Sequence, residues 1–291
     1  EVTPVWTEQE GDRHVGAVTI HAPADHSGDG TYIFRITYRD RSQNQMETYT
    51  SRSLVIDTVK PVIQVTYDET QKYASGQDWA GHSRDYYKET RTALLTVTEE
   101  HFVPEEVELS IEEQDVNGAS LEGDRRSSVT DWTVQADQYS RTLTYPGDAN
   151  YTFDVSYTDL AGNAAEDYPA DYFTVDGTPP TGLQVSYSTS VLDTVLGGIS
   201  FGFYQAPVTV TIRAEDSISG VHSFRYSYRK AADVSRVNAE LKDQKIEEEA
   251  IHFSGDRTVG TAEFTIPRDA LDGDHQFHGT VAFDAADRSG N

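Results

Sequence analysis

Aspartates recur in two settings of this sequence, and carboxylates placed in this way could bind a divalent cation. One setting is a short linker that leads into proline, and the other is a turn or loop beside a predicted strand. Calcium prefers hard oxygen ligands of this kind. The alternative is that aspartate simply suits turns. The candidate calcium ligands are Asp40, Asp57, Asp159, Asp176 and Asp216, with Asp287 as a further turn residue.

The loop from Gln77 to Tyr87 is a second candidate site. It contains Trp79 among polar neighbours and ends in Tyr86 and Tyr87. An exposed indole can stack on a sugar or pack on a protein. The expected partner of this loop is therefore a protein or a glycan. The alternative is that Trp79 covers an edge of the fold.

No constellation of residues predicts catalysis. The Gly198–Gly202 segment matches Gly-x-Ser-x-Gly around Ser200, but a nucleophile elbow needs a strand, a turn and a helix, and this segment lies in a glycine-rich loop between predicted strands. Cysteine is absent, and the nine histidines form no His-x-x-x-His pair. We expect no enzymatic activity and no required cofactor, with Ca²⁺ as the one ion to consider.

The charge of the chain also excludes partners. It carries 49 acidic and 23 basic side chains, a net charge of −26. Such a chain repels nucleic acid and anionic membrane surfaces. No apolar run reaches the roughly 18 residues of a membrane helix. The acidity either keeps neighbouring molecules apart or supplies cation ligands.

The elements that position these residues repeat along the chain. The segment Tyr32–Asn44 aligns without a gap with Tyr151–Asn163, an offset of 151 − 32 = 119 residues, and Val281–Asn291 closes the chain as a third copy. An earlier strand also repeats, with Ala93–Val97 answering Val208–Ile212. We predict three units: residues 1–58 as the C-terminal half of a domain, 59–177 as a complete domain, and 178–291 as a domain without its last strand.

Each unit is predicted to be a β-sandwich. Apolar and polar residues alternate at a period of two, and about seven short strands fit into roughly 115 residues. One or two helical turns are expected between Ser235 and Ala250. Proline at Pro61 and at Pro179–Pro180 stiffens the linkers, so we expect an elongated arrangement.

These motifs resemble a known family. The turn Asp159–Asn163, a following strand, and then Val175–Pro180 look like the tandem bacterial immunoglobulin-like domains of large cell-surface proteins and adhesins, those of Gram-positive bacteria in particular. Tyr86–Lys88 and Phe203–Gln205 look like the aromatic residues that precede a strand in that family. The resemblance implies an all-β chain of tandem immunoglobulin-like β-sandwiches.

The same resemblance implies a location and a role. Such proteins are extracellular, on the cell surface or cell wall of a bacterium. The expected function is a non-catalytic spacer or stalk that presents an adhesive or catalytic head. The alternatives are an adhesin module that binds a host or neighbouring-cell surface protein or a glycan through its loops, and an accessory region of a secreted carbohydrate-active enzyme.

Overall fold

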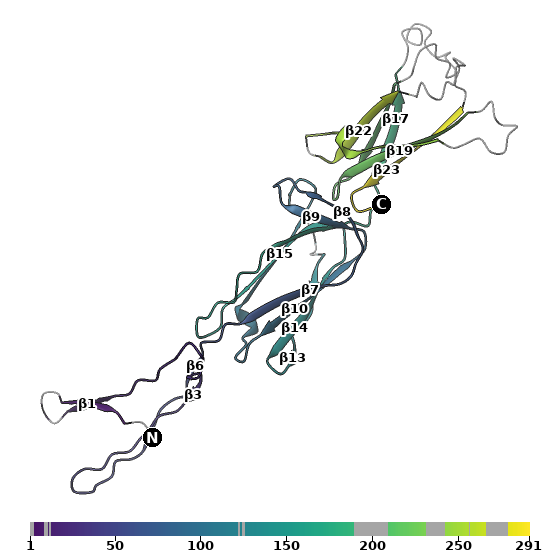
Figure 1. Cartoon of the computed structure of the whole chain (residues 1–291). Coiled ribbons are helices and arrows are strands. Elements are labelled where there is room, and N and C mark those ends of the chain that lie inside the picture. The colour runs from purple at the N-terminus through teal and green to yellow at the C-terminus, as the bar shows by residue number, and fades with distance from the viewer. Residues whose placement is uncertain are drawn as a thin grey trace.

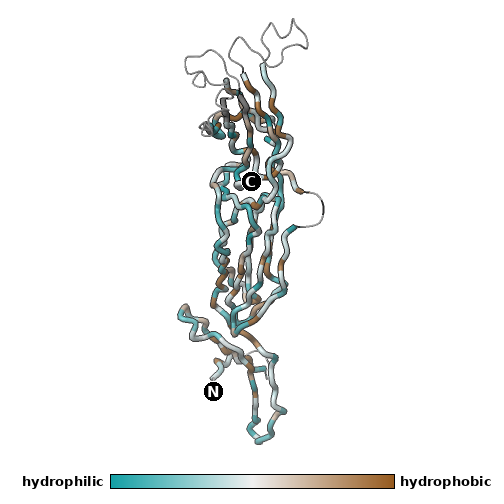
Figure 2. Tube along the Cα trace, turned by 90° about the vertical axis from the view of Figure 1, so that its right-hand side faces the viewer, coloured by the Kyte–Doolittle hydropathy of each residue, from teal (hydrophilic) through white to brown (hydrophobic). Residues whose placement is uncertain are grey.

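The protein is all-β. The computed structural model describes residues 3–8, 11, 13–121, 123, 126–188, 209–230, 242–255, 257–265 and 279–291, and no α-helix occurs among them. Three groups of sheets follow one another along an elongated molecule, in chain order (Figure 1). Figure 2 shows the same lengthwise arrangement from the side, with hydrophobic and hydrophilic residues interspersed along the strands. None of the helical turns in the described part is long and apolar enough to span a membrane.

The middle group is a sandwich of two five-stranded sheets. The first sheet has the order β12-β14-β10-β7, with β13 also paired to β14, and the second has the order β11-β15-β16-β9-β8. All neighbours are antiparallel except β16 and β9, which are parallel. The strands are β7 (Val62–Tyr67), β8 (Lys72–Gln77), β9 (Ser83–Tyr87), β10 (Arg91–Thr98), β11 (Val107–Gln114), β12 (Ser128–Val129), β13 (Thr133–Gln135), β14 (Gln138–Tyr145), β15 (Ala149–Tyr157) and β16 (Asp171–Val175), with a 3-10 turn η1 (Pro104–Glu106) before β11.

The core of this sandwich lies between its two sheets. Leu95 and Leu143 from the first sheet meet Phe153 and Phe173 from the second, and all four are at most 1% exposed. Alternate residues of β10 are buried, which is the period-2 pattern of a strand with one face in the core. Burial of this apolar surface is the main force that holds the two sheets together.

The third group is a smaller sandwich, with a four-stranded sheet β17-β18-β22-β21 and a three-stranded sheet β20-β19-β23. Its core contains Ile212 and Ala262 from one sheet and Phe224 from the other. The strands are β17 (Thr181–Tyr187), β18 (Thr209–Glu215), β19 (Val221–Lys230), β20 (Lys242–Ile246), β21 (His252–Phe253), β22 (Val259–Thr265) and β23 (Gly279–Asp287), with a 3-10 turn η3 (Glu248–Ala250).

The first group consists of short two-stranded pairs. They are β1 (Val5–Glu8) with β2 (His14–Ala17), β3 (Gly30–Tyr32) with β6 (Leu54–Ile56), and β4 (Arg35–Ile36) with β5 (Tyr49–Thr50). Trp6, Ile36 and Tyr38 are 60%, 51% and 59% exposed. No large hydrophobic side chain among the described residues before Pro61 is buried. This group therefore lacks the second apolar layer that a sandwich requires.

The helical turns expected between Ser235 and Ala250 are only partly found. Residues 231–241 lie outside the described part. Beyond them, Lys242–Ile246 is strand β20, which pairs with β19, and only Glu248–Ala250 forms a 3-10 turn. Strand pairing with β19 therefore overrides the weak helical spacing of Leu241 and Ile246.

Candidate functional site

Three aspartates meet where the central sandwich joins the third group. Asp176 follows β16, Asp216 follows β18, and Asp287 ends β23. One carboxylate oxygen from each lies within 4.8 Å of the others, and the three residues are 1%, 7% and 2% exposed. Asp176 and Asp287 are 111 positions apart in the chain (287 − 176) and still share one buried cluster. We call the cluster of Asp176, Asp216 and Asp287 the second joint, because it is the later of two such clusters along the chain.

Backbone amides stabilise the three carboxylates of the second joint. Asp176 accepts hydrogen bonds from the amides of Thr178 and Ser219, at 3.0 and 3.1 Å. Asp216 Oδ1 accepts two, from Ile218 and Gly220. Within the described part of the chain, no lysine, arginine or histidine forms an ion pair with any of the three. The negative charges are therefore partly solvated but not neutralised.

Burial changes the protonation of this cluster. It raises the pKa of Asp176 to about 7, and the neighbouring charge of Asp216 adds to the rise. Burial also raises the pKa of Asp216 and that of Asp287, and the charge of Asp216 contributes to the latter. Three buried carboxylates without a positive partner must bind protons or a cation, because an unpaired buried charge is costly.

Neutral oxygen atoms in the turns of the second joint add to its possible metal ligands. Ser219 Oγ, Ser289 Oγ and Asn291 Oδ1 are buried and have no hydrogen-bond partner among the described residues. All three belong to the turns that follow Asp216 and Asp287. Buried polar atoms are normally satisfied. Calcium takes six to eight oxygen ligands. Carboxylate, hydroxyl and amide oxygens are all ligand atoms that this ion accepts.

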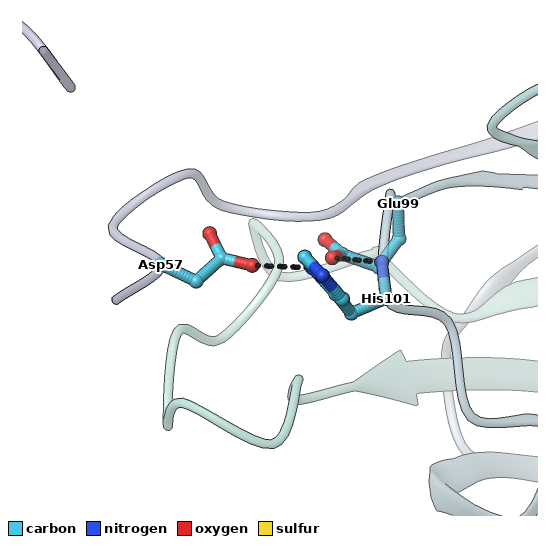
Figure 3. A group of neighbouring side chains, drawn as sticks. All are labelled: Asp57, Glu99 and His101. Carbon is cyan, nitrogen blue, oxygen red and sulfur yellow. Dashed lines mark hydrogen bonds and ion pairs between the residues drawn. The ribbon is translucent and has the colours of Figure 1, made fainter. Parts of the chain in front are cut away.

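A related cluster, the first joint, lies where residues 1–58 meet the central sandwich. Asp57, Glu99 and His101 each offer one ligand atom within 4.8 Å of the others. His101 Nδ1 is 3.4 Å from Asp57 Oδ2, and the His101 amide donates to Glu99 Oε1 at 2.9 Å. Figure 3 shows the imidazole of His101 between the two carboxylates. Burial raises the pKa of Glu99, and the charges of Asp57 and Asp159 add to this effect.

The two joints are built on equivalent residues. The Asn163 side chain donates to the carbonyl oxygen of Asp57 at 3.1 Å, and the Asn291 side chain donates to that of Asp176 at 2.8 Å. Each asparagine also donates to the aspartate that begins its own turn, Asp159 or Asp287. The Asp-x-x-x-Asn turn therefore fastens the preceding linker, a role that goes beyond reversing the chain.

Strand pairing corrects one alignment within the repeat. Ala93 pairs with Tyr67, and Val210 pairs with Tyr187, so Ala93 corresponds to Val210 and not to Val208. The shift of two residues keeps every side chain on the same face. It also makes Glu99 the counterpart of Asp216, an equivalence that the sequence alignment missed. The buried Glu99 was absent from the predicted ligands for this reason, and the exposed His101 was not predicted either.

The predicted metal ligands are thus distributed over different places. Asp176 and Asp216 meet in the second joint with Asp287. Asp57 belongs to the first joint, and Asp159 lies near enough to influence Glu99. Asp40 stands apart from both joints. Among the described residues its carboxylate binds only its own turn, where Asn44 donates to both of its carboxylate oxygens.

The aromatic candidates also separate. Tyr86 and Tyr87 are 1% and 5% exposed, so neither ring presents a free face at the surface. Tyr87 packs in the core of the central sandwich, and Tyr86 contacts Arg288 of the third group. Trp79 is half-buried and lines a surface cavity of about 310 Å³. Ser200 and Phe203–Gln205 lie outside the described residues.

The comparison with known proteins adds no relative. No protein-family model matches the chain, and no curated protein has a significantly similar sequence.

Proposed function

We propose that this chain is a non-catalytic spacer, a series of immunoglobulin-like sandwiches in an extracellular stalk that holds a head domain away from a bacterial surface. The observation that carries the proposal is the repeated joint. The same asparagine-to-linker hydrogen bond recurs at Asn163 and at Asn291. A repeated joint sets successive units in a repeated relationship, as a stalk requires.

Contacts across the second joint support this role. The Val116 amide donates to the carbonyl oxygen of Ser217 at 2.9 Å, and the Asn150 side chain donates to that of Ile218 at 2.8 Å. Arg288 lies over the ring of Tyr86, with 5.6 Å between its guanidinium carbon and the ring centroid. These bonds come from several loops, so they oppose both bending and rotation of one unit against the next.

A bound calcium ion is part of the proposal. At the second joint it would bind Asp176, Asp216 and Asp287, which come from three different elements on the two sides of the linker. Its charge would offset the repulsion between them. The result would be a joint that stiffens in extracellular, calcium-rich surroundings.

Calorimetric melting in EDTA and in millimolar calcium tests the cation. A ligand that binds only the folded form raises the melting temperature. We expect a rise for the wild type and little or none for Asp216→Asn, which removes one ligand charge but keeps an acceptor for the amides of Ile218 and Gly220. Asp40→Asn, outside both joints, is the matched control and should respond like the wild type. An equal rise in all three proteins would refute calcium binding at this joint.

Small-angle scattering tests the spacer. The maximum dimension should match an extended series of units and should not depend on protein concentration. A compact particle, with the sandwiches folded back on one another, would refute the stalk whatever the outcome for calcium.

A further inference from the structure

The cavity beside Trp79 lies on the outer face of the second sheet of the central sandwich. Its volume is about 310 Å³. Its floor is a row of outward-facing side chains on paired strands, because Glu112 pairs with Thr152 and Thr152 pairs with Tyr172. The loop between β8 and β9, which carries Trp79, forms its wall. We call this cavity the Trp79 groove.

A buried arginine shapes the Trp79 groove. Arg84 is 1% exposed and donates to the carbonyl oxygens of Tyr151 and Phe173 and to the carboxylate of Asp78. Its guanidinium carbon lies 5.3 Å from the ring centroid of Trp79 and 5.9 Å from that of Tyr172. These contacts fix the two aromatic rings at the edge of the groove before any ligand arrives. Such preorganisation lowers the entropic cost of binding.

One polar atom of the groove lacks a partner. Arg84 Nε is buried and makes no hydrogen bond to the described residues, although Arg84 itself lines the cavity. An unsatisfied buried donor destabilises the fold. Because this atom is fully covered, a ligand in the groove cannot reach it, and the polar contacts of the groove come from the exposed side chains of Glu112 and Asp154.

We propose that the Trp79 groove binds a neutral saccharide. Its lining joins the indole of Trp79, on which the apolar face of a sugar can pack, with carboxylates that accept hydrogen bonds from sugar hydroxyls. The ring of Tyr172 is already stacked on His82, with 4.1 Å between the ring centroids, and supports the floor of the groove. The carboxylates are those of Asp78, Glu112 and Asp154. The cavity is near the lower end of the roughly 300–1,000 Å³ range of ligand sites, which suits one or two sugar rings.

Charge selects the class of saccharide. The groove holds three carboxylates, and only that of Asp78 is paired with Arg84, with Nη2 and Oδ2 3.1 Å apart. The whole chain has a net charge of −26. Sialylated, sulfated and uronic sugars are therefore repelled, whereas uncharged hexoses and N-acetylhexosamines are not. The polarity of the lining also disfavours an apolar peptide side chain.

Titration of the whole chain with neutral disaccharides tests this proposal. Lactose, maltose, cellobiose and N,N′-diacetylchitobiose are the probes, followed by saturation-transfer NMR and by tryptophan fluorescence. At least one should bind, and 3′-sialyllactose should bind more weakly than lactose. The variant Trp79→Ala should lower the affinity for the bound disaccharide about tenfold or more.

Two matched controls separate binding from folding. Trp132 is half-buried like Trp79 and also packs under an arginine, with Arg141 4.8 Å from its ring, but it lies on the opposite sheet. Trp132→Ala should leave the affinity unchanged. Glu112→Ala should weaken binding several-fold, whereas Glu108→Ala, four residues earlier on β11 and outside the groove, should not.

The outcomes decide the proposal. The proposal is supported if Trp79→Ala and Glu112→Ala lose affinity for the disaccharide while Trp132→Ala and Glu108→Ala keep it. Failure of the wild type to bind any probe, equal losses in the controls, or tighter binding of sialyllactose than lactose would overturn it. None of these results depends on whether the chain is a spacer.

Discussion

The side-chain amide of Asn291 donates a 2.8 Å hydrogen bond to the backbone carbonyl oxygen of Asp176, 115 residues earlier in the chain. Asn163 makes the same bond to Asp57. Each asparagine ends a turn whose first residue is an aspartate, so one short motif both closes a turn and fastens a linker. The recurrence of this contact links the repeat in the sequence to the arrangement of the units.

Removal of the Asn291 side chain should loosen the second joint. Asn291→Ala loses the bond to Asp176 and leaves that carbonyl without this donor, at a cost of about 1 kcal/mol. Calorimetry should show a lower melting temperature for the third group. Asn44→Ala is the matched change, because the Asn44 side chain bonds to Asp40 of its own turn and to no other described residue. An identical loss from both substitutions would contradict the proposed role of Asn291.

Acidification should stabilise the second joint in the absence of metal. The folded-state pKa of Asp176 is raised to about 7 from an ordinary value of 3.8, so the folded chain binds the proton more tightly. The resulting stability is complete below about pH 3.8 and is lost as the pH rises through about 7. In EDTA, Asp216→Asn should melt above the wild type at pH 8, and the difference should shrink towards pH 5.

Asp40→Asn is the control for this pH dependence. Hydrogen bonds from Asn44 lower the pKa of Asp40, so its charge does not change between pH 5 and pH 8. A constant difference between Asp216→Asn and the wild type across this range would show that the carboxylates of the joint do not titrate there.

Gly118 should be required for the position of Trp79. Its φ is +84°, and a Cβ placed there would lie 2.2 Å from Trp79 Nε1. Gly118→Ala should therefore lower the free energy of unfolding by more than the roughly 1 kcal/mol that a positive φ alone costs. It should also shift the tryptophan fluorescence. Gly81→Ala isolates the conformational cost, because Gly81 has φ +86° and a Cβ added there would meet no atom of the described part of the chain within 4 Å. Equal losses of stability in Gly118→Ala and Gly81→Ala would argue against a tight contact between residue 118 and Trp79.

Arg84 should be among the most sensitive positions of the central sandwich. Arg84→Met leaves the carboxylate of Asp78 without its cation in a site where both side chains are 1% exposed, at a cost of about 3–5 kcal/mol. Arg213→Met removes an exposed pair with Glu215 and should cost less than about 1 kcal/mol. Urea unfolding measures both, and similar losses would contradict the structural role of Arg84.

The sequence predicts the β-rich fold well because the patterns that encode it are local. Alternation in β10 and the Asp-x-x-x-Asn turns can be read within a few residues. The Asp40 turn lacks the glycine of the later copies, and Gln43 adopts the positive φ of 67° in its place.

The candidate site is harder to predict because it depends on pairing between distant strands. Period-2 patterns look the same after a shift of two residues, so Glu99 could not be matched to Asp216 until the partners of β10 and β18 were known. Tyr86 and Tyr87 lie beside a polar loop in the sequence, but Tyr87 packs in the core of the central sandwich and Arg288 of the third group lies over the ring of Tyr86. Burial at such positions is a property of the assembled sheet.

A spin-label distance across the second joint measures whether the repeated joint fixes one unit against the next. The chain has no cysteine, so Val134→Cys and Leu183→Cys, at positions 61% and 44% exposed, place labels on the central and third groups alone. In millimolar calcium we predict one narrow distance population, which broadens when Asn291→Ala is added. A broad distribution in the parent, unchanged by that substitution, would show that the second joint does not fix the two units against each other.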